Sequence, residues 1–149
     1  MYRRLNRYIS ILYRYGQRYF AHYLHPLGLE PGQAPSLFRV LDCPGVSQDE
    51  IATELCIDKG AVARSVQQLE QNGLVARHAD PSDRRVNRIY PTMRARELEP
   101  QIIEVAEGLQ QALYAGFSPE EIQKASELLS RMQQNMRDYM DRVENGEQD

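Results

Sequence analysis

The chain has 149 residues, of which 42% are hydrophobic and 26% charged, so it is long enough for one domain with a hydrophobic core. No apolar run approaches the length of a membrane span, and the start MYRRLNRYIS lacks an apolar signal-peptide region, so we expect a cytoplasmic protein. Two cysteines are too few for a disulfide framework. The net charge of −3 excludes a uniformly basic protein, yet residues 58–94 carry seven Lys or Arg against four Asp or Glu.

Residues 2–24 are predicted to form a long helix, because apolar side chains recur at three- and four-residue steps and His25-Pro26 ends the pattern. This segment holds six of the nine tyrosines, which is more than one buried stripe accommodates. The surplus indicates either a contact with another subunit or an aromatic pocket for a small ligand, since tyrosine suits both. A second, shorter helix is predicted over residues 31–42, with Pro35 near its first turn.

Residues 47–73 have the pattern of two short helices joined by a tight turn. Ser47 and Glu50 have the spacing of a capping box, in which each side chain bonds an amide of the first turn. Asp58 is placed to cap the second helix, and Asn72-Gly73 ends it.

The second of these helices has two unlike faces. One face is apolar and should meet a core, while the other is small or hydrogen-bonding, with one arginine and no carboxylate. The residues of this second face are Gly60, Ala61, Arg64, Ser65 and Gln68, and Lys59 lies at the helix start. Small residues allow a helix to enter the major groove of DNA, and donors reach base edges and phosphates. We therefore predict a DNA-recognition helix, with an ordinary solvated face as the alternative and an Arg64–Asp83 salt bridge as the alternative for that arginine.

Residues 74–91 have the pattern of a β-hairpin, in which the strands LVARHA and VNRIYP flank the turn DPSDRR. Four arginines lie on or beside the hairpin: Arg77, Arg84, Arg85 and Arg88. A helix-turn-helix followed by such a hairpin is a winged-helix arrangement, in which the hairpin tip reaches the minor groove. We expect one of Arg84 and Arg85 to enter that groove and the other to bind phosphate. A solvated hairpin without a binding role is the alternative.

Two further helices are predicted after Thr92, the first of them interrupted by Pro100 and the second opened by a capping box at Ser118. Apolar residues of the last helix alternate steps of three and four: Ile122, Ala125, Leu129, Met132, Met136, Tyr139 and Val143. That heptad spacing calls for a partner helix. We therefore predict a homodimer that places two recognition helices about 34 Å apart on a palindromic operator.

The run from Asp58 to Thr92 resembles the recognition helix and wing of the MarR family of transcriptional regulators. The family pattern L-E-x-x-G-L-V occurs at residues 69–75, and D-P-x-D-x-R occurs at residues 80–85. The chain departs from the family where Pro91-Thr92 replaces Leu-Thr, which concerns the end of the second wing strand. The resemblance covers nearly the whole chain in element order and is strongest over residues 47–92.

This resemblance implies a mainly α fold with a small β-hairpin wing, in a single domain over residues 1–149. It assigns residues 30–92 to the DNA-binding lobe, and residues 1–25 and 93–145 to dimerisation helices. It also implies a repressor that a small aromatic or phenolic ligand releases from DNA. In the family's pattern Arg85 is the wing-tip arginine and Asp83 orients it. We also expect Arg88 to contact DNA, because it lies on the wing. Candidates for the effector pocket are Tyr15, Arg18, Tyr19 and His22.

Other functions find less support in the sequence. A zinc site built from His22 or His25 with carboxylates would keep the same fold. So would thiol sensing by a cysteine; we expect Cys56 to be buried and Cys43 to be more exposed. A winged-helix module that binds proteins would not need the arginines of the wing. No phosphate loop, metal-ligand spacing or acid–base pair is present in the sequence, so we expect neither a cofactor, a bound metal nor an enzyme.

Overall fold

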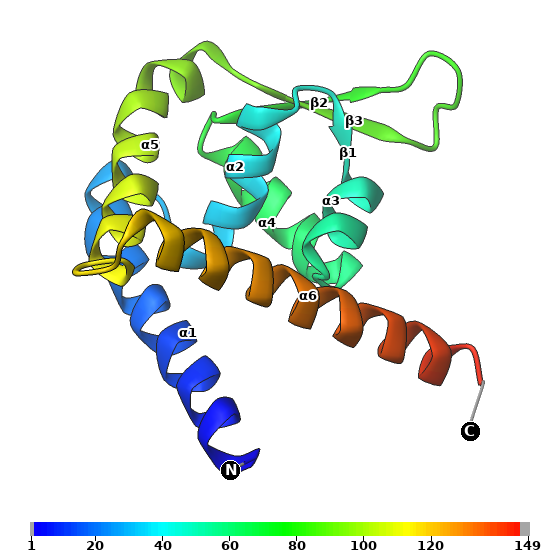
Figure 1. The fold of residues 1–149 in the computed structure, drawn as a ribbon. Helices are drawn as coiled ribbons and strands as arrows, with labels where there is room; N and C mark the ends of the chain where they lie inside the picture. Colours follow the sequence, from blue (N-terminus) through cyan, green and yellow to red (C-terminus); the bar gives the residue numbers. More distant parts are fainter. Residues whose placement is uncertain (1, 147–149) are drawn as a thin grey trace. The chain divides into compact units, whose positions relative to one another are not determined.

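The computed structural model describes residues 2–146, which form two compact units, one extending to Leu109 and the other beginning at Gln110. The first unit contains α1 (Tyr2–Leu24), the 3₁₀ turns η1 (His25–Leu27) and η2 (Pro31–Gln33), α2 (Ala34–Asp42), β1 (Val46–Ser47), α3 (Gln48–Leu55), α4 (Lys59–Gln71), β2 (Val75–Ala79), β3 (Asn87–Pro91) and most of α5 (Met93–Leu113). The second unit contains the end of α5 and α6 (Pro119–Glu144). The predicted mainly α, winged-helix class is confirmed (Figure 1).

The helix starts are where the capping residues place them. Ser47 Oγ accepts the backbone N–H of Glu50 at 3.1 Å, and the backbone N–H of Ser47 donates to Glu50 Oε2 at 2.7 Å. Asp58 caps α4 by accepting the N–H of Ala61 at 3.1 Å. The capping box at Ser118 opens α6 in the same way as the box at Ser47 opens α3. These side chains satisfy amides that have no partner within their helix.

The core of the first unit lies between α2, α3, α4 and the sheet. Fully buried side chains come from each of these elements: Leu37, Val40, Ile51, Val62, Val66, Leu69 and Ile89 are at most 1% exposed. Burying such side chains is the main favourable contribution to folding. Their packing fixes α4 from its apolar side and leaves its opposite face toward solvent.

The sheet has three antiparallel strands in the order β1-β3-β2. The predicted hairpin is present, with Val75 opposite Pro91 and Ala79 opposite Asn87, and it extends away from α2, α3 and α4 (Figure 1). Pro91 is the last residue of β3, and the hairpin continues beyond it because the N–H of Thr92 donates to the Leu74 carbonyl at 3.0 Å. The proline therefore ends the strand without breaking the wing. Strand β1 was not predicted.

The second unit exposes the apolar stripe of its long helix. No residue of α6 is buried, and the exposed fractions of Leu129, Met136 and Tyr139 are 58%, 58% and 54%. Tyr114 and Ser126 approach one another at 3.4 Å between their hydroxyl oxygens. None of the helices within residues 2–146 is long and apolar enough to cross a membrane.

Candidate nucleic-acid interface

The exposed face of α4 contains most of the residues that the sequence placed there. Lys59, Gly60, Arg64 and Gln68 are exposed, and Ala61 is half-buried. The structure adds Gln67 and Gln71, which were missed although they continue the row of Gly60 and Arg64 at steps of three and four residues. Helical spacing from Arg64 could have identified both.

Ser65 does not lie on that face, so this part of the prediction is wrong. It is 7% exposed, and its hydroxyl donates to the carbonyl of Gly32 in η2 at 3.4 Å. The short polar side chain lies at the edge of the buried stripe of α4, where it satisfies a backbone oxygen of the neighbouring turn. Ser65 therefore fixes α4 against η2 and is not available to line a groove.

The start of α4 combines a cap, a glycine and an exposed cation. A Cβ at Gly60 would lie 3.0 Å from Asp58 Oδ2 and 3.3 Å from Arg64 Nη1, so a glycine leaves room for both side chains. Lys59 Nζ lies 3.4 Å from Asp49 Oδ1, but both side chains are about three-quarters exposed and the pair is weak in water. The alternative Arg64–Asp83 salt bridge is not formed in the described residues, because Asp83 binds a different arginine.

That arginine is Arg85, at the tip of the wing. Asp83 accepts the backbone N–H of Arg85 at 3.1 Å and its Nε at 3.1 Å, and Nη2 lies 3.3 Å from the other carboxylate oxygen. These hydrogen bonds lower the pKa of Asp83, the side chain of Arg85 first and its backbone second. The side chain of Arg85 is nevertheless 91% exposed, and Arg84 beside it is exposed as well. The carboxylate thus orients a guanidinium that remains accessible.

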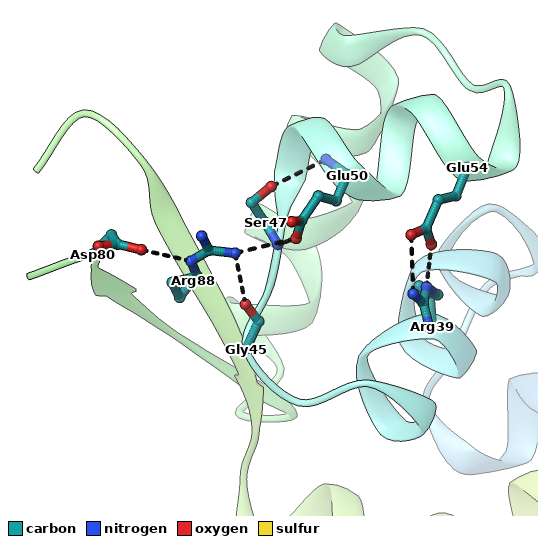
Figure 2. Close-up of polar contacts among 7 residues, drawn as sticks. All are labelled: Arg39, Gly45, Ser47, Glu50, Glu54, Asp80 and Arg88. Carbon is teal, nitrogen blue, oxygen red and sulfur yellow. Dashed lines mark hydrogen bonds and ion pairs between the residues drawn. The ribbon is translucent and has the colours of Figure 1, made fainter. Parts of the chain in front are cut away.

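Arg88 differs from its neighbours and corrects the prediction of a DNA contact. Its Nε donates to Asp80 at 2.8 Å, and its Nη1 donates to Glu50 at 3.2 Å and to the Gly45 carbonyl at 3.3 Å (Figure 2). The hydrogen bond from Arg88 is the main cause of the lowered pKa of Asp80. In Figure 2 the guanidinium lies between the turn of the wing and the first turn of α3. Because its Nε and Nη1 bind two carboxylates and a carbonyl, Arg88 fastens the wing to the helix-turn-helix.

Two other arginines connect the scaffold. Arg77 of β2 lies 3.3 Å from Glu70 of α4, which ties the wing to the recognition helix. Arg39 of α2 forms a two-pronged pair with Glu54 of α3, one bond of which is 3.0 Å long (Figure 2). Among the arginines of residues 74–91, the structure therefore separates two tip cations, Arg84 and Arg85, from two structural ones.

The four effector-pocket candidates lie on α1, and one of them, Tyr19, is bonded to another helix. The hydroxyl of Tyr19 donates to the Val105 carbonyl of α5 at 2.9 Å, and burial raises its pKa. The guanidinium carbon of Arg18 lies 5.5 Å from the centre of the Tyr15 ring, a cation–π contact. Tyr15, Arg18 and His22 are exposed.

The cysteines lie opposite to expectation. Cys56 is exposed and has a left-handed backbone (φ 51°) at the end of α3, whereas Cys43 is half-buried beside the core. The tight turn between α3 and α4 places Cys56 at a helix end and not on the buried stripe. Within residues 2–146 no group of three or more His, Cys, Asp or Glu side chains has the arrangement to hold a metal ion.

A helix-turn-helix (α3 and α4) followed by a β-hairpin on a three-stranded sheet defines a winged-helix protein. A model of the MarR family matches residues 29–86. A solved structure of a MarR transcriptional regulator from Methanosarcina mazei Go1 is 33% identical, with a TM-score of 0.85 over 91% of this chain and 97% of that one. The chain belongs to the MarR family. Members of this family are transcriptional regulators, not enzymes.

Two other relatives show the range of this similarity. A MarR-family transcriptional regulator from Listeria monocytogenes, solved in complex with a 26mer DNA, is 25% identical, with a TM-score of 0.89 over 96% of this chain and 95% of that one. YybA of Bacillus subtilis (strain 168), an uncharacterized HTH-type transcriptional regulator, is 27% identical over 80% of each chain.

Proposed function

We propose that this chain is a sequence-specific regulator that binds double-stranded DNA in the cytoplasm as a homodimer. The observation that carries the proposal is the accessibility of α4 and the wing tip. Arg64, Arg84 and Arg85 are exposed, whereas Arg77 and Arg88 are half-buried and bind carboxylates of neighbouring elements. A solvated hairpin without a binding role would not need to keep some arginines exposed while others are held in structural ion pairs. The relative from Listeria monocytogenes that was solved with DNA supports the same use of the fold.

In this proposal α4 enters the major groove and the wing tip reaches the neighbouring minor groove. Arg64 is the main contact residue of α4 and binds a guanine edge or a phosphate, and Lys59 binds the DNA backbone. Arg84 and Arg85 share the minor groove and its phosphates. Arg88 and Ser65 support the interface from within the protein, because Nε and Nη1 of Arg88 and the hydroxyl of Ser65 bond to other residues of the chain.

The apolar surfaces of both units support a second copy of this chain as partner. On α1, Tyr8, Ile9 and Leu12 are between 51% and 59% exposed, and the heptad stripe of α6 is exposed from Leu129 to Val143. Apolar surfaces of this kind are expected to pair in water. Two-fold symmetry would then match two recognition helices to the half-sites of an inverted repeat.

The experiment is selection from a random duplex library, followed by binding measurements at fixed salt with competitor DNA. The expected result is an inverted repeat whose half-site centres lie about 10 base pairs apart. Sedimentation at micromolar concentration should give a dimer. A library without enrichment would exclude sequence-specific binding, and a monomer would exclude the two-fold arrangement.

We further propose that the protein is a repressor and that a small aromatic or phenolic effector relieves repression. The exposed tyrosine-rich face of α1 supports this proposal, because aromatic rings stack on such surfaces while Arg18 can bind an acidic group. Such an effector acts only through a higher affinity for a state that does not fit the operator. Thermal melting against a panel of aromatic acids would show a rise in Tm for a binding ligand, and release of DNA by that ligand tests repression.

A further inference from the structure

Gln33 is a buried amide whose orientation is fixed by the backbone. It ends η2, forms the N-cap position of α2 and is 4% exposed. Its Oε1 accepts the backbone N–H of Glu30 at 3.0 Å. Because a backbone N–H can only donate, this bond determines which end of the amide is the oxygen. The Nε2 end of Gln33 therefore faces its other neighbour, which is on α4.

That neighbour is Gln68, one helical turn after Arg64. The Nε2 of Gln33 donates to Oε1 of Gln68 at 3.3 Å, so the oxygen of Gln68 is turned toward the protein. Gln68 is exposed, and because its oxygen is turned toward Gln33, the end of the amide that remains for a ligand is Nε2, which carries two N–H groups. A chain of two hydrogen bonds thus runs from the Glu30 backbone to the outer face of the recognition helix.

This orientation matters because base edges differ in donors and acceptors. In the major groove guanine offers the acceptors N7 and O6 and thymine offers O4, whereas cytosine offers only the donor N4. The bidentate pairing of glutamine with adenine needs the amide oxygen as well as the amino group. An amide that points its N–H groups outward is matched to guanine or thymine and mismatched to cytosine.

We infer that Gln33 is a specificity-determining residue, which selects guanine or thymine at the base that Gln68 meets by turning the amide of Gln68. Gln33 itself is a positioning residue, since it lies behind α4. The inference rests on the proposed function, because it requires α4 to lie in the major groove. It concerns the choice of base and not the overall affinity for DNA.

The first step of the test locates the contacted base. Random-duplex selection is run with the wild type and with Gln68→Ala, and the position that loses its preference is the one that Gln68 reads. At that position the wild type should prefer guanine or thymine over cytosine by about three- to tenfold, the range expected for one hydrogen bond. Unchanged preferences at every position with Gln68→Ala would overturn the inference while leaving the proposed function intact.

The second step reverses the amide. In Gln33→Glu both carboxylate oxygens accept, one from the Glu30 N–H and one from Gln68, so the Gln68 amide should turn over and present its oxygen. The preference should then shift by a similar factor toward cytosine or adenine, whose amino groups donate. A negative charge at the N-cap of α2 is favourable for that helix, and thermal melting verifies the fold.

The third variant, Gln33→Met, keeps the size of the side chain and removes its hydrogen bonds. It should reduce the preference between acceptor and donor edges without reversing it, so it carries the test even if Gln33→Glu fails to fold. A Gln33→Met or folded Gln33→Glu protein that retains the wild-type base preference would overturn the inference. A wild type that enriches no sequence would instead overturn the proposed function.

Discussion

The two kinds of wing arginine make a quantitative prediction about salt. Arg85 is 91% exposed and bonded to one carboxylate, whereas Arg88, three residues away, is 32% exposed and bonded to two. A cation that binds a phosphate releases counterions, which gives log K a slope of about −0.9 per contact against log salt. A cation bound within the protein contributes no such slope. Of these two arginines, only Arg85 should therefore change the salt dependence of binding.

The expected change in slope follows from one Arg85 contact per wing and two wings in the proposed dimer. Loss of both Arg85 contacts should make the slope about 1.8 less negative. At 0.15 M salt, one contact contributes about 5.5-fold to the binding constant relative to 1 M salt, so two contribute about 30-fold. Binding should weaken by this amount without a preference among sequences, unless Arg85 also reads a base.

The assay compares two double variants that leave the net charge unchanged. Arg85→Gln with Asp83→Asn removes the tip pair, and Arg88→Gln with Glu50→Gln removes a pair that fastens the wing. Fluorescence anisotropy between 50 and 300 mM salt, about a sixfold range, gives both slopes. The first variant should lose about 1.8 units of slope, and the second should bind more weakly at the wild-type slope. Equal loss of slope in both would show that Arg88 also binds phosphate, and a wild-type slope in the first would exclude Arg85 from the interface.

Three further predictions concern stability and assembly. Hydrogen bonding lowers the pKa values of Glu50 and Asp80 in the folded protein. The two carboxylates therefore stabilise the fold fully above their unfolded pKa values, and this stabilisation is lost as the pH falls through the folded pKa values. In thermal melts from pH 6 to about pH 3, the Tm of Glu50→Gln should fall less steeply than the Tm of the wild type. Ser118→Ala removes a capping side chain and should destabilise α6 by about 1 kcal/mol in urea unfolding, whereas Ser118→Asp should retain most of the stability. Met136→Lys puts a charge on the exposed stripe of α6 and should raise the dimer dissociation constant in sedimentation. Asn135→Lys, one residue away and off the stripe, serves as the control. Equal effects of the two variants would argue against a heptad contact between subunits.

Local chemistry explains why so much of the fold could be predicted. Ser47, Asp58 and Ser118 cap their helices because their side chains bond amides three residues away, and no distant contact is needed. The hairpin follows in the same way from a turn rich in Asp, Pro and Ser. Strand β1 escaped prediction because two residues have no detectable period, and they pair only because β3 lies beside them.

The errors at the site have a different origin, because they depend on contacts between distant parts of the chain. Ser65 and Arg64 look equally polar in the sequence, but Gly32 lies against one and solvent against the other. Arg88 resembles Arg85 in the sequence, but its guanidinium donates a hydrogen bond to Glu50, 38 residues earlier in the chain. A polar pattern therefore predicts which helix and which turn carry the interface, while the division between binding and positioning residues requires the packing.

Contacts with residues distant in the sequence also hold the C-terminal end of α4. Arg94 Nη1 donates to the Asn72 carbonyl at 2.7 Å, and the Thr92 hydroxyl donates to the Gly73 carbonyl at 2.6 Å. Together with the bond from Ser65 to η2, they tie α4 to the segments that follow α1 and open α5. Helix ends with satisfied carbonyls resist fraying, so a shift of either segment should carry α4 with it as a rigid element. In the proposed mechanism, an effector bound near α1 would alter the fit to DNA by moving α4 as a unit, without unfolding it.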